Sequence, residues 1–151
     1  MIRAIVALML LATPAMAAPG MEAVSQAVAL EPFNGAFVVP VLLNGVLTEK
    51  FIVDSGAADV SIPAEVASRL KALGALKGAD FLGSKIYMLA DGSKVSSDIY
   101  RISSIAIGRT VIHDVTVRIS AERSHLLLGQ SFLSRLKSWS MDNARGVLAV
   151  N

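Results

Sequence analysis

Hydrophobic and polar residues alternate along much of this chain with a period of two, which is typical of strands that bury one face. Asn44-Gly45 separates two such runs and predicts a two-residue type I′ hairpin turn, because both positions can take positive φ. Asp91-Gly92 is a second hairpin signal, between longer arms of mixed polarity. Strands are therefore expected over residues 37–43, 46–53, 60–62, 84–90, 93–102, 105–107, 110–119, 126–128, 138–141 and 147–150.

Helical spacing is rarer in this sequence. Apolar residues recur at helical intervals over 64–73, ending with Leu73, after Pro63, which suits a first helical position. Gly74 is the expected C-terminal stop of this helix, and residues 131–136 predict a second, brief helix. Residues 18–34 have only weak periodicity and are expected to form a flexible, loosely docked lead-in. The pattern predicts one mostly β domain over residues 35–151, with one or two short helices.

The first residues have the features of an export signal. A short basic start, Met1-Ile2-Arg3, precedes an apolar stretch over 4–12 that is too short to span a bilayer as a helix. Ala15-Met16-Ala17 then supplies the small-x-small pattern that signal peptidase reads. Residues 1–17 are therefore expected to be a cleaved signal peptide, and the protein to be periplasmic or secreted. Retention of this segment as a membrane anchor is the weaker alternative.

Composition excludes several classes of function. The 151 residues suit one domain, and removing Arg3 leaves 13 basic against 12 acidic residues, a net charge of +1. The basic residues are scattered without aromatic interleaving, which argues against a nucleic-acid surface. Cysteine is absent, which excludes a thiol nucleophile and a thiolate metal site. His113 and His125 lack metal-ligand spacing, so no metal and no cofactor are expected.

The candidate chemistry lies where the second strand ends. Asp54 follows the apolar run Phe51-Ile52-Val53, and Ser55, Gly56 and Ala57 come directly after it. A carboxylate held on a strand end is rigidly placed, as acid–base chemistry requires. A serine nucleophile is disfavoured, because Ser55 has neither a neighbouring His nor a G-x-S-x-G elbow. Asp91 also follows an apolar stretch, but its glycine follows at once, so its turn explains it.

Asp54-Ser55-Gly56-Ala57 resembles the active-site signature of aspartic proteases. Over about residues 37–150 the chain resembles the single-lobed, retropepsin-like (retroviral-type) members. It has a hairpin with Ala90-Asp91-Gly92 at its tip, where the family carries its flap, followed by Leu127-Leu128-Gly129. The stretch 128–133 looks like the bacterial exported or membrane-anchored branch. The resemblance implies a single-lobed retropepsin-like acid-protease barrel that is active as a homodimer on peptide or protein substrates.

The resemblance also implies roles for individual residues. Asp54 would be the catalytic acid, and Ser55 would brace the partner's turn across the dimer axis. Gly56 and Ala57 would support the catalytic turn of their own chain. The element that supports this turn from below would be Leu127, Leu128 and Gly129. A flap would close over an extended peptide substrate, and it would consist of Met88, Leu89, Ala90, Asp91, Gly92 and Ser93. An ordinary exposed hairpin is the alternative reading of that segment.

The chemistry explains why one motif per chain suffices. Amide hydrolysis without a metal needs a base to activate water and an acid to protonate the carbonyl oxygen. Two adjacent carboxylates, of which aspartic proteases are the standard example, cannot both ionise and so share a proton. The chain has one such motif, so the second carboxylate would come from Asp54 of another copy.

Two positions depart from the viral pattern. Ala58 and Gln130 stand where viral members carry an acid and an arginine that pair, and Asp59 is a candidate for part of the acid's role. The alternative function is a catalytically silent binding or scaffold module of the cell envelope. The intact motif favours the enzyme, because a scaffold would be more stable without a desolvated carboxylate.

Overall fold

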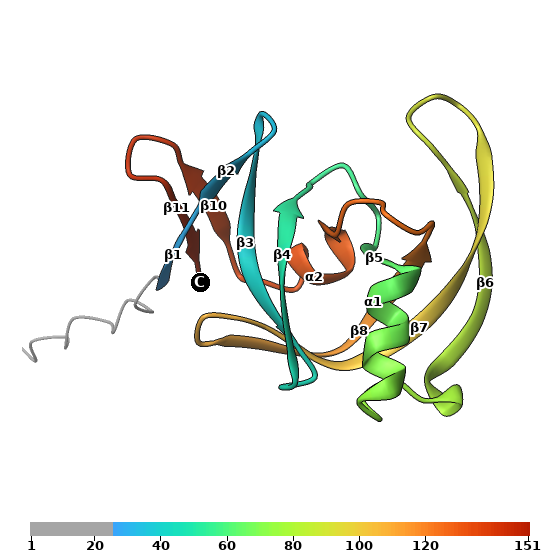
Figure 1. Cartoon of the computed structure of the whole chain (residues 1–151). Coiled ribbons are helices and arrows are strands. Elements are labelled where there is room, and N and C mark those ends of the chain that lie inside the picture. The colour runs from blue at the N-terminus through green and yellow to red at the C-terminus, as the bar shows by residue number, and fades with distance from the viewer. Residues whose placement is uncertain (1–25) are drawn as a thin grey trace, which may run out of the picture.

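The computed structural model describes residues 26–151, which form a strongly curved β structure with short helices inside and beside it (Figure 1). The expected signal peptide and its cleavage site after Ala17 lie outside these residues. Within residues 26–151, no helix is long and apolar enough to cross a lipid bilayer. The expectation of a mostly β fold with one or two short helices is confirmed.

Strands make up most of the elements within residues 26–151. The strands are β1 Gln26–Ala29, β2 Glu31–Phe33, β3 Ala36–Leu43, β4 Leu47–Val53, β5 Val60–Pro63, β6 Phe81–Met88, β7 Lys94–Ile107, β8 Thr110–Ser120, β9 Leu127–Leu128, β10 Trp139–Asp142 and β11 Val147–Val150. The helices are α1 Ala64–Ala72 and α2 Gln130–Leu133, and a single 3₁₀ turn, η1, covers Gly78–Asp80.

The main sheet has eight strands in the order β2-β3-β4-β9-β5-β8-β7-β6. It folds back on itself, because β3 also pairs with β7 through Leu42↔Ala106 and Leu43↔Ile105. A second sheet, β1-β11-β10, lies beside β2 and β3, while the long β6–β7 hairpin projects from the opposite side (Figure 1). The short strand β9 runs parallel to β4 and antiparallel to β5, so it lies in the middle of the main sheet.

One apolar core holds these elements together. Phe51 of β4, Ile62 of β5, Leu128 of β9 and Phe132 of α2 are all fully buried in it. Complete burial of a side chain of this size stabilises the folded state by roughly 1.5–3 kcal/mol. The strand that ends at Asp54 and the element expected to support it are therefore anchored in the same core.

The N-terminal segment differs from the expected lead-in. Residues 26–29 form β1 and pair with β11 from Gln26↔Val150 to Ala29↔Val147, and residues 31–33 form β2 beside β3. The Gln26 side chain donates to the Ile107 carbonyl at 2.9 Å, and Leu30 is buried. These strands have only four and three residues, which is too short for a clear alternating pattern. The partner of β1 is also distant in the chain, whereas β2 pairs with β3 across the turn at Asn34 and Gly35, a hairpin signal that was missed.

The loop of the β3–β4 hairpin has three residues instead of the expected two. Asn44 and Gly45 take positive φ as expected (47° and 68°), but pairing resumes only at Leu43↔Leu47, which leaves Val46 outside the ladder. Asn44 instead forms two hydrogen bonds with β7. Its backbone amide donates to the Ser104 carbonyl at 2.8 Å, and its side-chain Oδ1 accepts from the Ser104 backbone amide at 2.9 Å. This bridge holds the turn at residues 44–46 against the opposite strand.

The strands β7 and β8 form the longest hairpin of the fold. The runs expected over 93–102 and 105–107 are one continuous strand. In β8, strict alternation over 110–119 would place Val111, Val115 and Val117 on one face, and this expectation is wrong: Val115 and Val117 are fully buried, whereas Val111 is 46% exposed. The change of face occurs at Asp114, whose φ of 53° interrupts the regular strand conformation.

Helix α1 is shorter than expected. Pro63 ends β5 and precedes the helix with an extended conformation, and Gly74 stops it with a φ of 68°. Val66, Ala67 and Leu70 are buried as the spacing predicted, but Leu73 lies beyond the last turn and is 56% exposed. Helix α2 begins at Gln130, one residue earlier than expected, and ends at Leu133.

Candidate active site

Asp54 stands at the end of β4, where the neighbouring strand β9 fixes its backbone. The Ile52 amide donates to the Leu126 carbonyl at 2.9 Å, and the Asp54 amide donates to the Leu128 carbonyl at 3.2 Å. Because both strands lie inside the main sheet, the position of the carboxylate is set by buried backbone. The site residue therefore starts from a rigid base.

The loop after β4 folds back onto the carboxylate. Asp54 Oδ1 accepts hydrogen bonds from the Gly56 amide at 2.9 Å and the Ala57 amide at 3.2 Å. These bonds fix the orientation of the carboxylate and hold its charge in the field of two amide dipoles. The side chain is partly buried, and none of the ion pairs found among residues 26–151 includes it. The backbone thus orients Asp54, and no cationic side chain of the described residues neutralises it.

Gly56 allows the loop backbone to lie close to the Asp54 carboxylate. Its φ is not in the left-handed region, but a Cβ there would lie 3.3 Å from Asp54 Oδ1. Ser55 is exposed, and its carbonyl accepts from Gln130 Nε2 at 2.7 Å. The bracing role that family resemblance gives the Ser55 hydroxyl stays a prediction.

The residues expected to support the catalytic loop lie in β9 and directly after it, and β9 pairs with the end of β4. Leu127 and Leu128 form β9, and Leu128 is fully buried. Gly129 packs so closely that an added Cβ would lie 2.3 Å from the Asp59 carbonyl oxygen and 2.8 Å from that of Ala57. The Gln130 amide donates to the Ala57 carbonyl at 2.8 Å. A glycine is required here because another backbone segment occupies the space of a side chain.

Ser131 is a supporting residue that sequence reasoning missed. Its hydroxyl accepts from the Val60 amide at 2.8 Å and donates to the Thr116 carbonyl at 2.7 Å, while its amide donates to the Ala58 carbonyl at 3.0 Å. One side chain thus joins the loop after Asp54 to β8. A hydroxyl residue directly after the Gly129-Gln130 pair was the available sequence signal.

A pocket of about 330 Å³ opens beside the carboxylate. It brings together the catalytic loop, the outer end of the β6–β7 hairpin and strands β5, β8 and β9 of the main sheet. Three lining residues, Ser61, Tyr87 and Arg118, were not identified from the sequence. The full lining is Asp54, Gly56, Ala57, Ala58, Asp59, Ser61, Tyr87, Met88, Leu89, Ala90, Arg118 and Leu127.

Asp59 connects the catalytic loop to the hairpin. Its Oδ2 accepts a hydrogen bond from the Tyr87 hydroxyl at 2.5 Å and lies 3.5 Å from Lys85 Nζ. The guanidinium of Arg118 lies over the Tyr87 ring, 4.8 Å from its centroid. Burial, and next the hydrogen bond to Asp59, raise the pKa of Tyr87. The phenol therefore remains a donor to Asp59 over the whole ordinary pH range.

The expected flap divides into two parts. Met88, Leu89 and Ala90 line the pocket, and Met88 is 72% exposed. Asp91, Gly92 and Ser93 form the exposed turn: Asp91 Oδ1 accepts from the Ser93 amide at 2.9 Å and from the Ser93 hydroxyl at 2.6 Å. These bonds, the hydroxyl first, lower the pKa of Asp91. Asp91 thus has the local bonding of a turn residue and does not line the pocket with Asp54.

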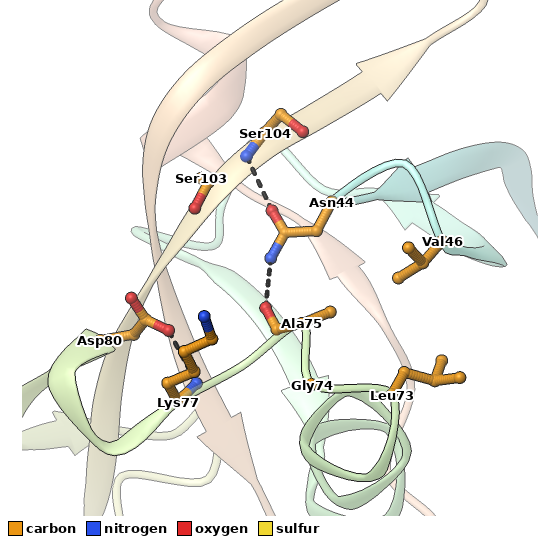
Figure 2. Close-up of a pocket in the computed structure, with 9 residues that line it drawn as sticks. All are labelled: Asn44, Val46, Leu73, Gly74, Ala75, Lys77, Asp80, Ser103 and Ser104. Atoms are coloured by element: carbon orange, nitrogen blue, oxygen red, sulfur yellow. Dashed lines mark hydrogen bonds between the residues drawn. The ribbon is translucent and has the colours of Figure 1, made fainter.

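A larger pocket, of about 370 Å³, lies between the β3–β4 turn, the end of α1 and β7. Figure 2 shows Asn44 at its centre, with its amide group donating to the Ala75 carbonyl at 2.6 Å and accepting from the Ser104 amide. The Asn44 side chain is thus used in joining three parts of the fold. None of this pocket's lining residues belongs to the pocket at Asp54, so size does not identify the chemical site.

Comparison with known sequences identifies the family. Residues 39–135, more than half of the chain, match the family described as "gag-polyprotein putative aspartyl protease". No curated protein sequence matches the chain. The match covers the elements from β3 to α2, which include Asp54 and the residues beneath it.

Solved structures agree with this match. A retropepsin-like aspartic protease from Rickettsia conorii is 25% identical, covers 84% of this chain and 89% of its own, and has a TM-score of 0.61. The retroviral protease-like domain of Ddi1 from Leishmania major is 19% identical over 77% of this chain and 88% of its own, with a TM-score of 0.51, which shows a common fold. The sequence match and the shared fold together show that this chain belongs to the retropepsin-like aspartic proteases.

Proposed function

We propose that the chain is an aspartic endopeptidase in which water is activated between the Asp54 carboxylates of two copies. The observation that carries this proposal is the state of Asp54. Two backbone amides orient its Oδ1, and no ion pair among the described residues neutralises it. A carboxylate with these properties is suited to take a proton from water and to share one with a second carboxylate.

The second carboxylate has to come from outside the chain's own pocket. Asp59 is the nearest alternative, because it lines the same pocket as Asp54. Its Oδ2, however, is held by the Tyr87 hydroxyl and faces Lys85. A carboxylate engaged in this way is a poor partner for sharing a proton with Asp54. A homodimer that brings two Asp54 side chains together supplies a symmetric pair instead.

The proposed substrate is an extended peptide bound under the β6–β7 hairpin. Ile86 and Met88 are 69% and 72% exposed near the end of β6, so this hairpin offers apolar surface to a ligand. An extended peptide can pair with such a strand and place its scissile bond above Asp54. The N-terminal pattern further supports export of the enzyme to the periplasm or the exterior, with anchoring in the membrane if residues 1–17 are retained.

Replacement of Asp54 by Asn tests the proposed role. The variant is expected to fold and to lose peptide cleavage by roughly 10³-fold or more, because the general base and its shared proton are removed. Cleavage of a mixed peptide library, measured by mass spectrometry at acidic and neutral pH, reads this out. Asp114→Asn is the matched control: it removes the same charge at an exposed position whose φ of 53° Asn tolerates. Full cleavage by Asp54→Asn would reject the mechanism.

Subunit mixing tests the shared site. An excess of Asp54→Asn subunits is expected to depress wild-type activity, because mixed dimers carry a single Asp54 carboxylate. Asp114→Asn subunits should leave it unchanged. Dilution of the wild type should reduce activity faster than linearly as the dimer dissociates. Activity strictly proportional to concentration, together with insensitivity to the mixed-in variant, would assign catalysis to the single chain.

A further inference from the structure

Arg118 places a guanidinium in the pocket of Asp54, and none of the acidic residues in the described part of the chain forms an ion pair with it. It lies on β8 and lines the same pocket as Asp54. Its Nε is buried and has no hydrogen-bond partner, and none of the ion pairs among residues 26–151 includes the side chain. A buried donor that is left unsatisfied is costly, and more so when it carries charge. The side chain is therefore placed as if an acceptor were to arrive from outside.

Ser61 provides a second, independent sign at the same place. It is 3% exposed, and its hydroxyl is the other buried side-chain group without a partner in the described part of the chain. The parallel pairing of β5 with β8 puts Ser61 directly opposite Arg118, and both residues line the pocket. Two unsatisfied donors on neighbouring strands thus converge on one region of the pocket.

The charges around Arg118 favour a carboxylate as the missing acceptor. Asp59, the other acid of the pocket besides Asp54, is already engaged by Tyr87 and Lys85. The Tyr87 ring stacks on the guanidinium and restricts its motion. A guanidinium binds a carboxylate through two parallel hydrogen bonds, which are stronger than bonds to a neutral carbonyl. Such a group fits this pocket better than an amide or an apolar side chain.

We propose that Arg118 and Ser61 form a specificity subsite that binds the carboxylate of a Glu or Asp side chain in the substrate peptide. This proposal rests on the proposed endopeptidase function, because the subsite opens onto the pocket of Asp54. Arg118 selects the substrate through its charge, and Ser61 donates one further hydrogen bond. Lys85 offsets the charge of Asp59, and the Tyr87 hydroxyl occupies its Oδ2, so that repulsion of the incoming carboxylate is reduced.

Matched peptides test the subsite through cleavage. A cleaved peptide is resynthesised with Glu or Gln at each position around the scissile bond in turn, and kcat/KM is measured for each pair. At one position the wild type should prefer Glu by roughly tenfold or more. Arg118→Met should abolish that preference, Arg118→Lys should keep part of it, and Ser61→Ala should reduce it less.

The control variant is Arg109→Met, which removes the same charge at the exposed tip of the β7–β8 hairpin. It should keep the full Glu preference. The absence of a Glu preference at every position would overturn the proposal. An equal loss of kcat/KM for the Glu and Gln peptides in Arg118→Met would also overturn it, since Arg118 would then contact the substrate backbone or only support the fold.

Binding separates this proposal from the endopeptidase itself. Fluorescently labelled Glu and Gln peptides are titrated with Asp54→Asn protein, with and without Arg118→Met, and fluorescence anisotropy gives the Kd. Tighter binding of the Glu peptide that depends on Arg118 supports the subsite even where the wild type cleaves nothing. Equal binding of both peptides, or binding of neither, rejects the subsite even where cleavage is found.

Discussion

Replacement of Gly129 by Ala should disrupt the support beneath the catalytic loop. Gly129 has a φ of −93°, which any residue adopts, so the expected effect comes from space alone. The added Cβ would lie 2.3 Å from the Asp59 carbonyl oxygen, whereas ordinary van der Waals contact begins at 3.4 Å. The two segments would therefore have to separate by about 1 Å, a strain comparable to that of an overpacked core.

The magnitude follows from what holds these segments together. The Gln130 amide donates to the Ala57 carbonyl at 2.8 Å, and the Ser131 amide donates to the Ala58 carbonyl at 3.0 Å. Overpacking costs roughly 1–3 kcal/mol, and each of the two weakened hydrogen bonds adds about 1 kcal/mol, so the total is about 3–5 kcal/mol. For a domain of this size, such a loss lowers Tm by roughly 12–20 °C.

Thermal unfolding followed by circular dichroism measures this effect, and Gly78→Ala is the matched control. Gly78 has no atom within 4 Å of an added Cβ and no positive φ, so its variant should stay within about 0.5 kcal/mol of the wild type. Peptide cleavage by Gly129→Ala should also fall, because the loop that orients Asp54 is displaced. Equal melting temperatures for the two variants would refute the close-packing argument.

Two further predictions concern side chains that sequence reasoning missed. Ser131→Ala should destabilise the fold by roughly 1–3 kcal/mol, because the amide of buried Val60 loses its partner. Ser134→Ala, which removes an exposed hydroxyl bonded to the Gln130 carbonyl, is the control in the same denaturant titration, and equal losses would contradict the reasoning. Burial and the hydrogen bond to Asp59 raise the pKa of Tyr87, so the stability that the neutral phenol contributes is present below about pH 10 and is lost as the pH rises toward the folded-state pKa. Tyr87→Phe should therefore lose less stability than the wild type between about pH 9 and pH 11. The same change of denaturation midpoint with pH in both proteins would count against this.

Local signals predicted those parts of the fold in which neighbouring residues interact. The Asn44-Gly45 turn, the stop at Gly74 and the run 126–128 all depend on residues close in sequence, and the structure places a turn, a helix end and strand β9 there. Strand β1 depends instead on β11, at the other end of the chain. The change of face at Asp114 likewise has no counterpart in the hydrophobic pattern, because Val111 is apolar and yet exposed.

Some residues of the candidate site were identified from the sequence, and others are brought together only by the fold. Asp54 was identified from its place at the end of a strand, and Gly129 from the resemblance to the retropepsin-like family. The structure brings Gly129 into contact with the loop after Asp54. Ser61 and Arg118 are neighbours only through the register of β5 on β8. That register is set by tertiary pairing of distant strands, and a single sequence carries no direct signal of it. The pocket's unsatisfied donors are consequently visible only in the folded chain.

Two neutral residues, Ala58 and Gln130, stand beside the catalytic loop where the viral pattern has a charged pair. Gln130 holds the loop through the Ser55 carbonyl without carrying a charge, and Ala58 offers no carboxylate to pair with one. The nearby acid, Asp59, is directed instead to Tyr87 and Lys85, which both belong to β6. Strand β6 leads directly to Met88 and the tip of the hairpin. A movement of the hairpin away from the pocket must therefore break the bond between Tyr87 and Asp59 or carry the catalytic loop with it, so that in this chain the hairpin and the loop bearing Asp54 are mechanically coupled.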